Sequence, residues 1–250
     1  MFMIGTFNLY ILLNTFIKIS FLSFLKRYLY SWSLSLIAPG QVGDASFILL
    51  LKNKISVKHT TLVYLFDKII TLCFYCLITL FGFSIYLSIN ISYIFLFFIS
   101  VSALSILILF YSKTKSQYFY SFIFDKKNIF VEIILNKKAI CKNILGTILK
   151  ILITGLTYYI AFKSFNVIIS WQDALVIPIM CTLVGYIPIS AAGIGTVEVS
   201  AVYIFSTIGI SSSVVISVYI LLRTCQFAIA VIVITFSLVF KKIFPNNIKE

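Results

Sequence analysis

Four of the charged side chains inside strongly apolar stretches of the sequence are the first candidates for function: Asp44, Lys68, Glu198 and Arg223. A charged group at the depth of the hydrocarbon is costly unless it is paired, faces the protein interior or lines a polar path. Because arginine cannot shed its proton, Arg223 is expected to bind an anion, either Glu198 or the phosphate of a lipid. The two carboxylates have two interpretations. They contact a substrate or ion directly, or they cap a helix N-terminus, which is worth about 0.3–1 kcal/mol.

Each carboxylate ends a segment that is rich in proline and glycine. Residues 39–44 read PGQVGD, and residues 188–198 read PISAAGIGTVE. Glycine permits tight turns and close approach of the backbone, and free N–H groups at the start of a following helix can hold a phosphate. The glycines that we therefore add to the candidate binding residues are Gly40, Gly43, Gly193 and Gly195.

The two segments belong to longer stretches of sequence that resemble each other. After each segment come an apolar run, a short turn and a second apolar run, in which VYLFDK (residues 63–68) corresponds to VYILLR (residues 218–223). Lys68 and Arg223 then occupy matching places, about eight and eleven residues into their spans, or ~12 Å and ~16 Å deep. Asp67 precedes Lys68 and is the last candidate for binding a substrate. Lys150 is expected only to extend to the membrane surface from a position near it.

The elements that must position these residues are membrane helices. Of the 250 residues, 61% are hydrophobic and 11% are charged, far from the composition of a soluble domain. A crossing helix needs about 20 apolar residues. We therefore predict an all-α polytopic membrane protein, a single domain over residues 1–250, with five spans and two re-entrant, broken-helix regions. The spans are residues 2–24, 61–87, 91–111, 144–165 and 212–240, and the broken regions are residues 29–51 and 174–208.

The basic residues predict how these elements are oriented. If both broken regions enter and leave on one face, fifteen of the twenty lysines and arginines share one side of the membrane. By the positive-inside rule that side is cytoplasmic, so the N-terminus lies outside and the C-terminus inside the cell membrane. Three spans then separate the broken regions, which makes the two repeats (residues 25–90 and 165–240) inverted in topology, as in many secondary transporters. The linker at residues 112–143 is expected at the cytoplasmic interface, either drawn to anionic lipids or as a plain connector.

Composition also limits the other classes of site. The net charge of +13 is explained by the loops of a membrane protein, so we expect no nucleic acid partner. Buried cysteines usually act as small hydrophobic residues, and the one histidine, His59, is expected in a solvated turn. We therefore predict no metal site and no cofactor.

The two motifs, P-G-x-x-G-D at residues 39–44 and P-x-S-x-x-G-x-G-x-x-E at residues 188–198, resemble those of the flippase-like family to which the membrane region of lysylphosphatidylglycerol synthases belongs. The resemblance covers residues 25–240. It implies movement of aminoacylated phospholipids, glycolipids or polyprenyl-linked sugars between leaflets. It also implies an acid–base pair, here Asp67 and Lys68, whereas Thr71 replaces an acid often found nearby. The 250 residues hold no counterpart of the synthases' soluble aminoacyl-transfer domain, so we expect no enzymatic activity.

Three functions remain in competition. The first is a lipid or polyprenyl-linked glycolipid translocase, in which the head group passes between the two broken helix pairs. The second is a membrane enzyme acting on polyprenyl-linked sugars, for which seven acids and one histidine offer few catalytic groups. The third is a non-transporting accessory protein that binds other membrane proteins of glycan assembly. The expected partners are accordingly anionic phospholipids or glycolipids.

Overall fold

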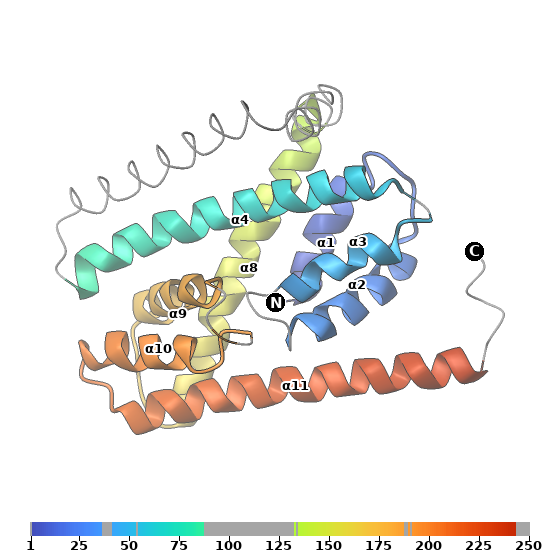
Figure 1. Cartoon of the computed structure of the whole chain (residues 1–250). Helices are drawn as coiled ribbons and strands as arrows, with labels where there is room; N and C mark the ends of the chain where they lie inside the picture. Colours follow the sequence, from blue (N-terminus) through green and yellow to red (C-terminus); the bar gives the residue numbers. More distant parts are fainter. Residues whose placement is uncertain are drawn as a thin grey trace, which may run out of the picture.

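The computed structural model describes residues 2–36, 42–53, 55–87, 133, 135–187, 190 and 192–243, and the regular structure within them is helical (Figure 1). The first group of elements comprises α1 (Phe2–Leu13), α2 (Phe21–Ser35), the 3₁₀ helix η1 (Val42–Ser46), α3 (Phe47–Leu50) and α4 (Val57–Tyr86). The second group comprises α8 (Lys137–Ser164), α9 (Trp171–Gly185), α10 (Thr196–Ser206) and α11 (Ser212–Ile243).

Three of the described helices are long and apolar enough to cross a membrane. They are α4, α8 and the part of α11 from Ser212 to Thr235. These helices match three predicted spans, residues 61–87, 144–165 and 212–240. The predicted span at residues 91–111 lies outside the described residues.

The predicted N-terminal span, residues 2–24, is wrong. Helix α1 ends at Leu13, and α2 begins only at Phe21. The Thr15 hydroxyl donates a hydrogen bond to the Leu12 carbonyl at 2.7 Å, and such local bonds compete with continuation of a helix. The twelve residues of α1 extend about 18 Å, which is too short for a hydrocarbon core of about 30 Å.

The break predicted in the second region is present in the structure, and the break predicted in the first is present only in part. Helices α9 and α10 have 15 and 11 residues and are separated by the glycine-rich segment, as predicted for residues 174–208. In the first region α2 already begins at Phe21, so Lys26 and Arg27 lie within a helix and not before one. Residues 42–44 of its motif already belong to the short η1, and the four-residue α3 follows.

The end of the predicted linker, residues 112–143, also needs correction. Helix α8 starts at Lys137, where the Asn136 side chain caps it by accepting a hydrogen bond from the Ala139 N–H at 3.1 Å. Residues 137–143 are therefore the first two turns of α8. The part of the linker from residue 112 to 132 lies outside the described residues.

Side chains along α4 are distributed as in a membrane protein, with polar groups inside. Thr71 and Thr79 are buried, whereas Leu77 and Phe81 expose 64% and 55% of their surface. In a water-soluble protein the distribution is the reverse, because such a helix buries its apolar side and exposes its polar one. The same inward polarity in α8, where Asn143 and Thr147 are fully buried, supports a helical protein embedded in lipid.

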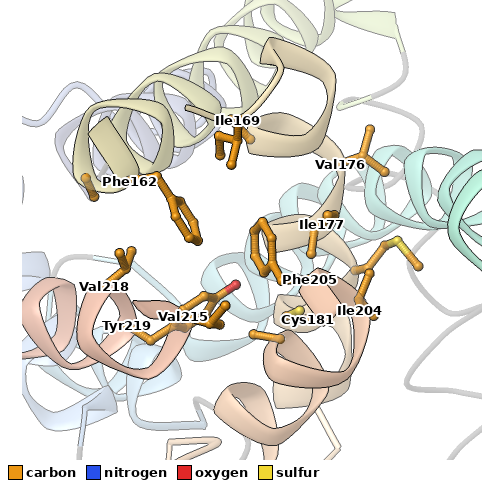
Figure 2. Close-up of a cluster of buried hydrophobic side chains, with 14 of the residues drawn as sticks. Phe162, Ile169, Val176, Ile177, Cys181, Ile204, Phe205, Val215, Val218 and Tyr219 are labelled. Atoms are coloured by element: carbon orange, nitrogen blue, oxygen red, sulfur yellow. The ribbon is translucent and has the colours of Figure 1, made fainter. Parts of the chain in front are cut away.

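Two separate hydrophobic clusters hold the two groups of helices together. The first is centred on α1 to α4 and includes Phe24 and Phe47. The second joins α8 to α11, where the Phe162 and Phe205 rings lie 4.7 Å apart (Figure 2). Each of these clusters also takes in a residue of the other group, Ala139 of α8 in the first and Tyr86 of α4 in the second. A third, smaller cluster of Tyr75, Ile151 and Ile179 lies between the two groups.

The two groups contact each other in a reciprocal way. Helix α4 packs against α9, and α11 packs against α2. The long helix of each group therefore covers the helix that precedes the motif in the other group. Figure 1 shows that α4 and α11 run in opposite directions.

Candidate functional site: two ion pairs on one cavity

Arg223 of α11 forms an ion pair with Glu198 of α10. The Arg223 Nε–H donates to Glu198 Oε1, which is one of the two partners predicted from the sequence. The other carboxylate oxygen, Glu198 Oε2, accepts a hydrogen bond from the Gly195 N–H at 2.7 Å. Glu198 therefore caps the N-terminus of α10 and pairs with Arg223 at the same time, and the N–H that we had expected to hold a phosphate is already satisfied.

The remaining Arg223 donors bind the glycine-rich segment. Its terminal nitrogens donate to the carbonyl oxygens of Ala192 at 3.4 Å and of Gly193 at 3.1 Å. The planar guanidinium has several donors in a fixed arrangement, and here each nitrogen has a protein acceptor. Arg223 thus fixes the segment between α9 and α10 against α11.

Lys68 of α4 and Asp44 of η1 form the corresponding pair in the first group. Lys68 Nζ lies 3.2 Å from Asp44 Oδ2, and the Tyr28 hydroxyl donates to the same oxygen at 3.4 Å. The second oxygen, Asp44 Oδ1, is buried and accepts no hydrogen bond from any described residue. This pair was not predicted, although Lys68 was recognised as the counterpart of Arg223.

Asp67 points away from its neighbour Lys68. It is 8% exposed, and its Oδ1 accepts a hydrogen bond from the Asn143 side chain of α8 at 2.8 Å. The same Asn143 nitrogen also donates to the Asn8 carbonyl of α1 at 3.3 Å. Asp67 therefore links α4 to α8 and, through Asn143, to α1. The neighbours Asp67 and Lys68 thus do not act as a pair, because Asp67 contacts Asn143 and Lys68 contacts Asp44.

Two of the candidate glycines meet requirements that a larger residue cannot. A Cβ on Gly43 would lie 2.5 Å from the Ser35 backbone, at the point where η1 passes the end of α2. Gly193 has φ +72°, and its Cβ would lie 3.1 Å from Gly185 Cα. Gly195 also has a positive φ, and Gly40 lies outside the described residues.

A cavity of about 430 Å³ lies between the two groups of helices, within the usual range of ligand sites. Both ion pairs contribute to its wall, through Asp44 and Lys68 on one side and Arg223 on the other, and Asp67 also lines it. The predicted charged residues are thus brought to a single cavity, except Glu198, which stands behind Arg223. No group of three or more histidine, cysteine or acidic side chains that could hold a metal occurs among the described residues.

The sequence interpretation missed Lys150 as a cavity residue. Lys150 lines the cavity and stands at the middle of α8, which runs from Lys137 to Ser164. Either end of the helix is about 20 Å away, and the side chain faces the cavity, with Nζ 5.7 Å from the centre of the Tyr75 ring. Lys150 is recognised as central in α8 only when the lysine-rich residues 137–143 are assigned to that helix.

Comparison with known proteins supports the resemblance seen in the motifs. The family described as Lysylphosphatidylglycerol synthase TM region matches residues 1–234. No curated protein and no solved structure matches the chain. The match extends over α1, which the motif-based resemblance at residues 25–240 had not included. Since it covers nearly the whole sequence, the chain belongs to the Lysylphosphatidylglycerol synthase TM region family.

Proposed function

We propose that this protein moves lipids, either anionic phospholipids or polyprenyl-linked glycolipids, between the two leaflets of the cell membrane. The head group passes through the cavity between the two groups of helices, while the acyl chains stay in the bilayer. The protein acts as a transporter and not as an enzyme. The observation that carries the proposal is a charged cavity of about 430 Å³ lined by both groups, within a bundle that exposes many large apolar side chains.

The proposal includes an inverted repeat. In it α1, α2, η1 with α3, and α4 correspond to α8, α9, α10 and α11. The reciprocal packing of α4 on α9 and of α11 on α2 is what a twofold relation requires. The opposite directions of α4 and α11 in Figure 1 support an axis in the membrane plane. Such a repeat lets the cavity open alternately to either side.

The orientation completes the proposal. The lysine-rich connections and the C-terminus are placed on the cytoplasmic side, whereas the N-terminus is no longer placed outside, because the 12-residue α1 is too short to cross the bilayer. The ion pairs then hold the two motif segments, one approaching the cavity from each leaflet. Anionic or glycosylated head groups are the partners that a charged cavity of this size can take.

The proposed function is tested with the full chain purified and reconstituted into liposomes containing fluorescent phosphatidylglycerol. A membrane-impermeant reductant measures how fast the outer label is replenished from the inner leaflet. We expect the protein to accelerate exchange over empty liposomes, and Arg223→Ala to abolish the gain because the motif segment is released. A rate equal to that of empty liposomes, from a protein that elutes as a folded species, would argue for the accessory role.

A further inference from the structure

Among the cations on the cavity wall, Lys150 differs in having no counter-ion in the part of the chain that the structure describes. Lys68 is paired with Asp44, and Arg223 with Glu198. Lys150 makes no ion pair with any residue that the structure describes, and the Asp67 carboxylate on the same wall is hydrogen-bonded to Asn143. Within the described residues, Lys150 is thus an unpaired cation at the centre of a long apolar helix.

The surroundings of Lys150 hold the ammonium group in place without neutralising it. Its Nζ lies 5.7 Å from the centre of the Tyr75 ring, a cation–π contact that is much weaker than an ion pair. The Tyr75 ring in turn lies 6.4 Å from the Tyr186 ring, and both tyrosines line the cavity. Neither hydroxyl group makes a hydrogen bond with the described residues, so both are free to donate to a ligand.

We propose that Lys150, with the Tyr75 and Tyr186 hydroxyl groups, binds the phosphate of the lipid head group in the cavity. An uncompensated ammonium at membrane depth is costly, and an anion brought in by the substrate removes that cost. A compact ammonium group is well suited to binding phosphate. The identification of the ligand as a transported lipid rests on the proposed function. This subsite restricts the substrate to lipids with a phosphate, whether a phospholipid or a polyprenyl phosphate sugar.

Arg223 and Lys68 take a different part in this arrangement. Their charges are neutralised by Glu198 and Asp44, and Arg223 also holds two backbone carbonyls. A phosphate would have to displace these bonds to reach them, whereas at Lys150 it displaces none among the described residues. The site of first binding is therefore on α8, between the two pairs.

The test is equilibrium binding to the purified full chain in a neutral detergent, measured by calorimetry. Three probes are used: dihexanoyl phosphatidylglycerol, inorganic phosphate and uncharged dihexanoylglycerol. Lys150→Gln should weaken binding of the phospholipid by about tenfold to a hundredfold, the effect of losing a charged hydrogen bond. Lys150→Arg, which keeps the charge, should retain most of the affinity.

The matched control is Lys163→Gln, on the same helix and with the same change of charge at an exposed position. It should bind the phospholipid as the wild type does. Equal binding by Lys150→Gln and the wild type, or equal losses in both lysine variants, would overturn the assignment. So would equally tight binding of the uncharged lipid. If inorganic phosphate binds and depends on Lys150, the subsite recognises the anion alone; if only the phospholipid does, it recognises the head group with its chains.

Binding and transport distinguish this inference from the proposed function. If Lys150→Gln loses binding while the wild type transports no lipid, the phosphate subsite stands and translocation fails. If Lys150→Gln binds and transports normally while Arg223→Ala does not transport, translocation stands and the Lys150 subsite fails. A shared elution profile and unfolding temperature show that each variant is folded.

Discussion

Arg223 and Glu198 form an ion pair between α11 and the first turn of α10, at a sequence separation of 25 residues. Lys68 and Asp44 repeat this relation between α4 and η1, 24 residues apart and with a 3.2 Å contact. In both groups of helices a cation on the long helix holds the carboxylate that follows the glycine-rich motif. The two pairs fix the two segments that border the cavity.

A double substitution tests whether Arg223 stabilises the protein through its ion pair with Glu198. Arg223→Leu leaves Glu198 without its cation in a largely buried place and should lower the free energy of unfolding by about 3 kcal/mol. Adding Glu198→Leu removes the unpaired charge but also the cap on Gly195, so stability should recover most, but not all, of that loss. The measurement is thermal unfolding in detergent for the three variants. A fully stable, fully active Arg223→Leu would contradict the pair's role in holding the segment.

The glycine at position 193 is expected to be irreplaceable for two reasons. Its positive φ and its contact with the Gly185 backbone both exclude a side chain, so Gly193→Val should prevent formation of a folded, monodisperse protein. The control is Gly209→Val, because Gly209 has φ +80° but nothing within 4 Å of an added Cβ. In that variant the backbone strain alone should lower the free energy of unfolding, by about 1–2 kcal/mol. Equal effects at the two positions would show that close packing of the segment is unimportant.

The orientation is tested by labelling single cysteines in whole cells with an impermeant maleimide. Asn166 lies in the exposed turn between α8 and α9, and Asn53 in the exposed turn between α3 and α4. In a cysteine-free background, Asn166→Cys should label from outside and Asn53→Cys only after permeabilisation. Removal of the native cysteines is needed because Cys73 and Cys141 are exposed. Labelling of both positions from the same side would rule out the proposed topology.

Parts of this structure follow from local sequence, and parts do not. The helices α4 and α11 are uninterrupted apolar runs and were predicted within about four residues. The Arg223–Glu198 pair was predicted because arginine cannot become neutral and needs an anion nearby. The break after α1 was missed because residues 2–24 are mostly apolar, and the polar residues Asn14, Thr15, Lys18 and Ser20 that mark it are interleaved with apolar ones.

Other features depend on contacts between distant segments. Asn8 donates to Thr147 at 3.3 Å across 139 residues, and no local pattern indicates that α1 packs on α8. Lys150 was misplaced because residues 137–143 contain three lysines, which suggest a loop, although Asn136 caps a helix there. The Asp44–Lys68 pair could have been predicted from the sequence, because the alignment that matched Lys68 to Arg223 also matched Asp44 to Glu198.

Passage of the head group through the cavity is tested most directly by obstructing it. Thr157 is half-buried on the cavity wall, and Thr157→Trp should fill space there without touching either ion pair. Ile160→Trp, one turn further along α8 and 56% exposed toward the lipid, is the matched control. In reconstituted liposomes we predict that Thr157→Trp reduces phosphatidylglycerol exchange to about a tenth of the wild-type rate or less. This loss corresponds to a barrier higher by about 1.4 kcal/mol. Ile160→Trp should leave the rate unchanged. Wild-type exchange by a folded Thr157→Trp protein would contradict the central claim.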